Sequence, residues 1–280
     1  MDLTPKRLIL DLLATAPRRS MPVAALIAAA DLFELSENCL RVTLARLRAA
    51  GIVDLDERGR YRLAERSASV GRQVSAWREI EQRVRKWNGG WVGVHTAAVS
   101  RSERRAHRHG DRALRLLGFE RLEAGLHLRP DNLSGGVGAV RQQLHELGLD
   151  GKAIVFGVTA LDDRAEQRAR RLWDTRALRD GYRASLGELQ KSERRLGSLP
   201  AHEALVESFV LGGHVLRQLV LDPLLPEPLI VAGERQALVD AMSRYDRVGR
   251  SCWTSFLRQA VTDSASKRVS SVRNVRGEAA

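Results

Sequence analysis

The chain has 280 residues, of which 44% are hydrophobic, and this length and composition predict a folded protein with two or three cores. Its 46 Lys and Arg against 34 Asp and Glu give a formal net charge of +12, which favours a polyanionic partner such as nucleic acid or a phosphorylated ligand. The two cysteines are isolated, which argues against a disulfide framework and a zinc site. The first apolar run is short and contains Asp11, so we expect no signal peptide, no membrane contact and a cytoplasmic location.

The first part of the chain has the pattern of short helices. Thr4 and Pro5 are a typical cap and first-turn residue of a helix. Pro17 and Pro22 bracket a predicted turn, and an alanine-rich segment that starts at Val23 predicts a second short helix.

A third helix and a hairpin follow. Ser36 is the expected cap of this helix. Its buried stripe, at spacings of four and three, consists of Leu40, Leu44 and Leu47. Two short apolar segments around Gly59, where the turn requires a positive φ, predict a pair of strands. Three helices and a hairpin with a basic tip are the layout of a winged helix-turn-helix, which we assign to residues 1–66.

The face of the third helix opposite that stripe has the residue types that read DNA. In a helix-turn-helix this face lies in the major groove, where asparagine pairs with adenine, arginine reaches guanine or phosphate, and valine contacts the thymine methyl group. Arginines at the hairpin tip would meet the DNA backbone or the adjacent minor groove. The predicted DNA-binding residues are Ser36, Asn38, Arg41, Val42, Arg46, Arg58 and Arg60. The alternative is a winged helix that contacts another protein.

A regular apolar seam comes after the hairpin. From Val70 to Trp87 the apolar residues recur at intervals of three or four, which is the pattern of an amphipathic helix. We therefore predict one connector helix over residues 67–89. Residues 67–118 contain 11 basic and only 4 acidic residues, so the excess positive charge is concentrated in this part of the chain.

Residues 90–160 have the order strand, helix, strand, strand, helix, strand, which is that of a ferredoxin-like domain. Its first helix is rich in arginine and offers cations for the phosphates of DNA or of a bound ligand. The alternative is a solvated helix that covers a sheet. The phosphate-contacting candidates are Arg101, Arg104, Arg105 and Arg108.

This order of elements also resembles the CRISPR-associated Cas2 nucleases, which place an aspartate at the end of the first strand to hold a catalytic metal. The corresponding place in "GGWVGVHTAA" has His95 and Thr96. A metal-dependent nuclease is therefore an alternative function whose carboxylate is missing. We predict no catalytic residue, no metal and no cofactor, and so no enzyme.

The chain after residue 160 has helical patterns almost throughout, and we predict a helical domain over residues 161–261. The segment "DPLLPEPL" interrupts it, because prolines cannot continue a helix and the leucines require burial. We expect this segment to be extended and fixed, with Asp222 as a cap. Residues 262–280 show little apolar periodicity, which predicts a disordered tail.

Five motifs occur in a characteristic order along the chain: "LRVTLARLRAAGIV", "WNGGWVGV", "GFERLEAGLHLRP", "LWDTRALRDGY" and "DPLLP". Together they resemble the PaaX family of transcriptional repressors over nearly the whole chain. The resemblance implies an α+β protein with a winged helix-turn-helix, a Cas2-like middle domain without nuclease activity and a helical carboxyl-terminal domain. It also implies a homodimer that binds double-stranded operator DNA and represses genes of aromatic-acid, phenylacetate-type catabolism.

The same resemblance implies an effector, phenylacetyl-CoA or a similar acyl-CoA thioester, that releases the repressor from its operator. By resemblance, the effector-binding candidates are Trp173, Tyr182, His214 and Arg217. Their alternative role is core packing and pairing on helix surfaces. The chain departs from the family at Leu216, where an aromatic residue is usual, and at "LIVAG", where Trp-Pro-Gly is usual. A DNA-binding regulator without a CoA ligand is therefore the further alternative.

Overall fold

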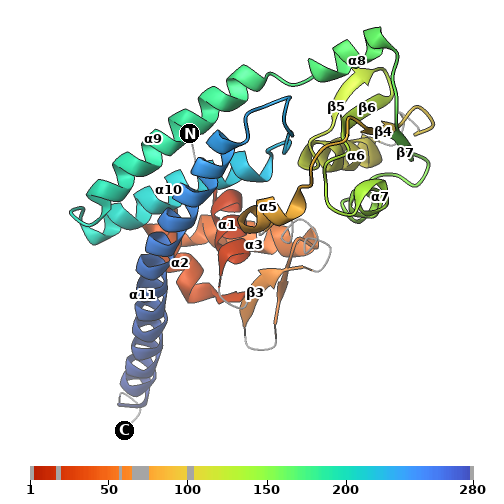
Figure 1. Cartoon of the computed structure of the whole chain (residues 1–280). Coiled ribbons are helices and arrows are strands. Elements are labelled where there is room, and N and C mark those ends of the chain that lie inside the picture. The colour runs from red at the N-terminus through yellow and green to blue at the C-terminus, as the bar shows by residue number, and fades with distance from the viewer. Residues whose placement is uncertain (1–2, 17–19, 57–58, 65–75, 100–103, 278–280) are drawn as a thin grey trace. The chain divides into compact units, whose positions relative to one another are not determined.

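The structure, a computed structural model, describes residues 3–16, 20–56, 59–64, 76–99 and 104–277, with the backbone alone for 81, 104–106 and 264–277. It is an α+β structure with two small antiparallel sheets (Figure 1). The chain divides into two compact units. Unit 1 consists of Met1–Gly71, Lys191–Gly213 and Arg244–Ala280, and unit 2 of Arg72–Gln190 and His214–Ser243.

Three long helices occupy most of the carboxyl-terminal part of the chain. They are α9 (Thr175–Leu196), α10 (Ala201–Val220) and α11 (Gly233–Gly277). Each helix contributes residues to both units. The helical region predicted over residues 161–261 is thus shared between the units and does not form a third one.

The amino-terminal part of unit 1 follows the predicted pattern of helices. Its elements are α1 (Pro5–Thr15), β1 (Ser20–Pro22), α2 (Val23–Asp31), α3 (Glu37–Ala49), β2 (Val53–Leu55) and β3 (Arg60–Leu63). Thr4 accepts a hydrogen bond from the Arg7 amide at 3.3 Å, and Ser36 accepts one from the Cys39 amide at 3.3 Å. Both predicted caps are therefore confirmed.

The sheet of unit 1 has one strand more than we predicted. Its order is β1-β3-β2, and both pairings are antiparallel. β1 ends at Pro22, within the segment predicted to be a turn. The turn prediction is wrong at Ser20–Pro22, because a proline is compatible with the end of an edge strand and β3 supplies the pairing partner forty residues later.

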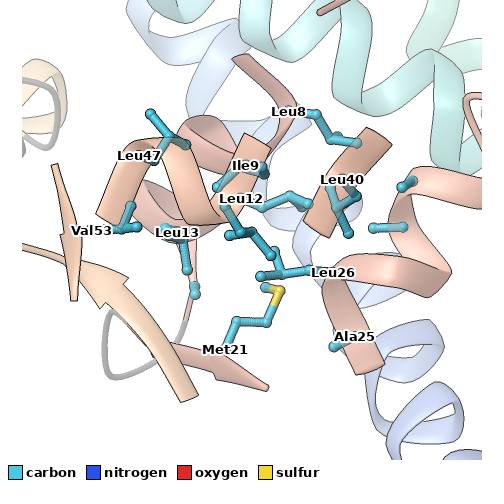
Figure 2. Close-up of a cluster of buried hydrophobic side chains, with 14 residues drawn as sticks. Leu8, Ile9, Leu12, Leu13, Met21, Ala25, Leu26, Leu40, Leu47 and Val53 are labelled. Carbon is cyan, nitrogen blue, oxygen red and sulfur yellow. The ribbon is translucent and has the colours of Figure 1, made fainter. Parts of the chain in front are cut away.

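The core of unit 1 is a single apolar cluster (Figure 2). Figure 2 shows side chains of α1, α2 and α3 converging, with Met21 of β1 and Val53 of β2 beside them. The predicted stripe of α3 is fully part of this cluster. Phe209 of α10 and Trp253 of α11 also pack against it, with their ring centroids 5.4 Å apart. Each fully buried leucine contributes about 1.5–3 kcal/mol to folding, so this core holds α3 rigidly.

Unit 2 contains the second sheet. Its elements are β4 (Trp91–His95), α6 (Arg104–Leu116), β5 (Glu120–Glu123), β6 (Leu126–Pro130), α7 (Gly136–Glu146) and β7 (Ile154–Val158). This is the predicted order of strands and helices. The strands lie in the order β5-β6-β4-β7, with every neighbouring pair antiparallel. Val92 and Val94 of β4, Leu114 of α6 and Val140 of α7 are buried in its core.

The predicted connector helix is wrong beyond residue 83. The described part consists of a 3-10 turn, η2 (Ala76–Glu79), and one turn of helix, α5 (Ile80–Arg83). Val84 is extended and forms a bridge with Leu133, and the Arg85 amide donates to the Asn132 carbonyl at 2.8 Å. These bonds to a distant segment replace the helical ones. Residues 65–75 lie outside the described part of the chain.

Two further predictions concern the last third of the chain. After the short helix α8 (Asp163–Arg170) and helices α9 and α10, residues 222–226 are buried and not helical, as predicted for "DPLLP". The disordered tail is a wrong prediction up to Gly277, because α11 continues to that residue. Lack of apolar periodicity indicates little burial, but no proline follows Pro228 to end the helix.

Candidate nucleic-acid interface

Helix α3 has one face that is buried in the core and an opposite face that is exposed. Leu40, Leu44 and Leu47 are at most 4% exposed. The opposite face contains side chains that are all exposed, namely Asn38, Arg41, Val42, Ala45, Arg46 and Ala49. Val42 is 41% exposed although it is apolar. The helix therefore presents amide, guanidinium and methyl groups on one accessible strip, with Ser36 beneath its first turn as the cap.

An acidic residue, Glu37, reduces the positive charge of this strip. Glu37 accepts a hydrogen bond from Nε of Arg41 at 2.7 Å, one helical turn away. Both side chains are more than half exposed, so the pair contributes little to stability, about 0.2–1 kcal/mol. Its main effect is on the strip itself, since the guanidinium of Arg41 is partly neutralised while that of Arg46 is not paired by any described residue.

The hairpin after α3 has a tight, hydrogen-bonded turn and a side-chain link to β1. The Gly59 amide donates to the Asp56 carbonyl at 3.0 Å, and Gly59 has the predicted positive φ of 70°. Arg60 donates from Nε to the Ser20 hydroxyl at 3.1 Å and from Nη2 to the Ser20 carbonyl at 2.9 Å. Arg60 therefore fastens β3 to β1, and only its remaining N–H groups face outward. Arg58 lies outside the described residues.

Sequence reasoning missed two exposed arginines near the strip. Arg48 is in the last turn of α3, and Arg62 is on β3, where its Cα pairs in register with Asp54 and Ser20. The signal for Arg62 was the alternation along β3, which places Arg62 on the same face as Arg60 and opposite Tyr61 and Leu63. Both arginines add positive charge beside the predicted reading face.

The predicted phosphate-contacting residues fall on α6 and the segment before it. Arg101 is outside the described residues, and of Arg104 and Arg105 the backbone is described as the first turn of α6. Arg108 is on the same helix and its side chain is exposed.

Two of the effector-binding candidates are buried in unit 2. Trp173 is 8% exposed and stacks on Trp91, with ring centroids 6.3 Å apart and planes within 2°. Trp91 in turn donates from Nε1 to Glu166 at 2.8 Å. Trp173 is thus packed in the interior of unit 2, in agreement with the packing role that we gave as its alternative.

Tyr182 belongs to a buried polar network. Its hydroxyl donates to Oδ2 of Asp222 at 2.5 Å. Burial, followed by the nearby Asp222 carboxylate, raises the pKa of the Tyr182 hydroxyl far above its ordinary value. Arg235 lies 3.7 Å from Oδ1 of Asp222, and burial raises the pKa of that carboxyl while Arg235 opposes the shift. The network holds the predicted extended segment in place, because Asp222 also accepts from the Leu224 amide at 2.8 Å.

The other two effector-binding candidates lie on α10. His214 is exposed and Arg217 is half-buried. Near them, Gln218 accepts a hydrogen bond from the Ser185 hydroxyl at 2.6 Å, which joins α10 to α9. The contacts of Trp173 and Tyr182 described above are made with residues outside the predicted effector set.

Comparison with known proteins places the chain beside a solved structure. No protein-family profile and no curated protein matches the sequence. Among solved structures, the chain is similar to the uncharacterized protein Rv0674 from Mycobacterium tuberculosis, with a TM-score of 0.54 and 23% sequence identity. The similarity covers 90% of this chain and 99% of that chain, and shows a shared fold. The resemblance to the PaaX family stays a prediction from the motifs.

The described residues also bear on a metal site and on a membrane span. His95 is exposed at the end of β4, where the nuclease alternative requires a carboxylate. No group of three or more His, Cys, Asp or Glu side chains in the described part of the chain is placed to hold a metal ion. In the same part, no helix combines the length and the apolar character that crossing a membrane requires.

Proposed function

We propose that the chain is a DNA-binding transcriptional regulator that reads double-stranded DNA with α3. The single observation that carries the proposal is the exposed strip from Asn38 to Ala49, which stands opposite a fully buried leucine stripe. The element order α1-β1-α2-α3-β2-β3 and the sheet order β1-β3-β2 support a winged helix-turn-helix. In that fold α3 is the recognition helix and the β2–β3 hairpin is the wing.

The contacts follow from the chemistry of the strip. Asn38 and Arg46 are suited to the edges of adenine and guanine, and Val42 to the methyl group of thymine. The Ser36 hydroxyl accepts from the Cys39 amide, one of the free amides in the first turn of α3, and this cap stabilises the helix that presents the strip. Arg48 of α3 and Arg62 of the wing are exposed and suited to phosphates, which position the helix without reading sequence.

The test begins with selection of a preferred duplex from random DNA, followed by fluorescence anisotropy with the selected and a scrambled site. Arg46→Ala should weaken binding to the selected site by about 1–3 kcal/mol and reduce discrimination between the two duplexes. Arg194→Ala, an exposed arginine on α9 with the same change of charge, is the matched control. Equal affinities of the Arg46 and Arg194 variants for the selected site would sink the proposal.

We further propose that the sheet of unit 2 is ferredoxin-like and Cas2-like in layout, with a regulatory role and no nuclease activity. Its support is the strand order β5-β6-β4-β7 combined with the βαββαβ order along the chain. Incubation of plasmid DNA with the protein and Mg²⁺ or Mn²⁺ tests this part, since cleavage that a His95→Ala variant loses would contradict it.

The regulatory half of the proposal is a homodimeric repressor of aromatic-acid catabolic genes, released by an acyl-CoA thioester such as phenylacetyl-CoA. Its support is the resemblance of the five motifs quoted above. A thioester that binds the folded chain should stabilise it by about 2.7 kcal/mol at a hundred times its dissociation constant. Thermal unfolding against a panel of thioesters, with free CoA as the control, measures this; no stabilisation by any of them would leave DNA binding without a CoA ligand.

A further inference from the structure

Helix α6 carries an uninterrupted row of exposed arginines on the side away from the sheet. The buried residues of this segment are Gly110, Ala113, Leu114, Leu116 and Leu117, and all of them except Leu116 recur at helical spacing on one side of the helix. The row on the opposite side consists of Arg108, Arg112 and Arg115, all exposed. At 100° per residue the three lie within about 60° of one another around the helix axis.

The three guanidinium groups have no acidic partner among the described residues. Several other exposed arginines of unit 2 have one, as Arg168 has Glu123 at 2.8 Å and Arg183 has Glu234. No side-chain hydrogen bond or ion pair joins any guanidinium of the row to a described residue. Asp111 is the acidic neighbour on this helix, and it is exposed at the margin of the row. The positive charge of the row is therefore available to an external anion.

We propose that this row is a second, sequence-independent contact surface for the phosphate backbone of a nucleic-acid duplex. At a rise of 1.5 Å per residue the row extends for about 10 Å, a length over which one strand of a duplex presents about three phosphates. Arginine suits this role because its planar fork can donate two parallel hydrogen bonds to one phosphate. The inference deepens the proposed function, on which it rests for the presence of DNA.

The shape and surroundings of the row favour a duplex over other anions. The arginines form a line on a convex helix and do not converge on one point, as they would for a single phosphorylated small molecule. A membrane-surface helix would need exposed large apolar side chains beside its cations. Of the exposed large apolar side chains among the described residues, none is on α6.

The experiment measures how salt weakens binding to a labelled 20-base-pair duplex of random sequence. Log affinity decreases linearly with log KCl concentration, and the magnitude of this slope becomes smaller by about 0.9 for each phosphate contact that is lost. Arg108→Gln/Arg112→Gln/Arg115→Gln should therefore reduce the slope by roughly 2 to 3. The control Arg176→Gln/Arg194→Gln/Arg247→Gln removes the same charge from exposed positions elsewhere and should leave the slope close to that of the unaltered chain.

A lysine variant separates charge from folding. Arg108→Lys/Arg112→Lys/Arg115→Lys keeps the cations and should retain the slope of the unaltered chain, with circular dichroism confirming the fold of all variants. An equal slope for the glutamine variant and its control would overturn the inference. So would loss of binding to phosphatidylserine vesicles with the duplex slope unchanged, which would identify a lipid surface as the ligand.

The design also distinguishes this inference from the proposed function. Random-sequence duplex reports on phosphate contacts, whereas the preference for the selected site reports on α3. If Arg46→Ala leaves the preference intact while the α6 variant lowers the slope, the reading helix is wrongly assigned and the phosphate surface stands. If the preference is lost in the first variant and the slope is unchanged in the second, the phosphate surface is overturned and the reading helix stands.

Discussion

The Tyr182 hydroxyl donates a 2.5 Å hydrogen bond to Oδ2 of Asp222, and both side chains are buried. The two residues are forty positions apart and belong to α9 and to the segment between α10 and α11. On the far side of this segment, Asn132 donates to the Leu224 carbonyl at 2.7 Å and accepts from the buried Arg129 at 2.9 Å. Burial lowers the pKa of Arg129 to about 9, so this guanidinium is still charged at neutral pH. The proline-rich segment at residues 222–226 is thereby held by hydrogen bonds to Tyr182 and to Asn132.

Tyr182→Phe should destabilise the folded chain without altering DNA binding. The substitution removes one of the hydrogen-bond donors to a buried carboxylate, which costs about 1–3 kcal/mol. Urea denaturation followed by circular dichroism measures the difference in unfolding free energy. Tyr61→Phe, at a half-buried tyrosine of β3 whose hydroxyl forms no hydrogen bond with a described residue, is the control and should change stability by less. An equal effect of the two substitutions would contradict the role assigned to the hydroxyl.

Glu234→Gln should change how stability depends on acid pH. Glu234 accepts hydrogen bonds from Arg179 at 2.9 and 3.0 Å and from Arg183, and these arginines lower its pKa from 4.5 to about 2. Because the folded-state pKa lies below the unfolded-state value, the carboxylate stabilises the fold above about pH 4.5, and this contribution is lost as the pH falls toward 2. The variant should therefore lose less stability than the unaltered chain over that window.

Urea denaturation at several pH values between 5 and about 2 measures this dependence. Glu188→Gln, at an exposed position of α9, removes the same charge and serves as the control. Parallel pH profiles for the Glu234 variant and the unaltered chain would show that the two arginines do not stabilise the carboxylate.

Gly118→Ala should be more destabilising than an ordinary glycine substitution. Gly118 has a φ of 71°, and an added Cβ would lie 2.5 Å from Cα of Pro223. The positive φ and the overlap together should cost roughly 2 to 4 kcal/mol. Gly89→Ala isolates the first effect, because Gly89 has a φ of 90° and no atom within 4 Å of an added Cβ. Equal losses of unfolding free energy in the two variants would mean that the loop at Pro223 moves aside without cost.

Glu37→Gln should increase affinity for DNA. The substitution removes a negative charge from the outward strip of α3 and releases Arg41 from its 2.7 Å ion pair. A gain of up to about 1 kcal/mol, or roughly fivefold, corresponds to the strength of such an exposed pair. Anisotropy with the selected duplex measures it, and Glu203→Gln on α10 controls for the change in net charge. Weaker binding by the Glu37 variant would indicate that this carboxylate itself contacts a base.

The reading strip was predictable from the sequence because its determinants are local. A cap at Ser36, leucines at spacings of four and three, and a glycine at position 51 place the helix and its two faces within sixteen residues. The strands of the hairpin were predictable for the same reason, since Gly59 supplies a positive φ in the turn. The order of strands and helices in unit 2 likewise follows from short periodic segments.

The errors have a common origin in partners that are distant along the chain. The apolar seam predicted a helix through Trp87, but Val84 pairs with Leu133 and leaves the helix early. Arg60, a predicted DNA contact, donates two hydrogen bonds to Ser20 of β1, a partner that no local pattern indicated; its contact with DNA stays a prediction. Composition showed that the chain is basic, but not which arginines are neutralised.

The sequence by itself determined where helices start, which faces they bury and which turns require glycine, because capping, periodicity and backbone sterics act over a few residues. The tertiary structure alone decided that Arg168 and Arg183 are paired with acidic residues far along the chain, while Arg108 and Arg112 are not. It also decided that Tyr182 belongs to the interior. Hydrogen bonds and ion pairs depend on distances between side chains, and those distances exist only once segments far apart in the sequence have been brought together by folding.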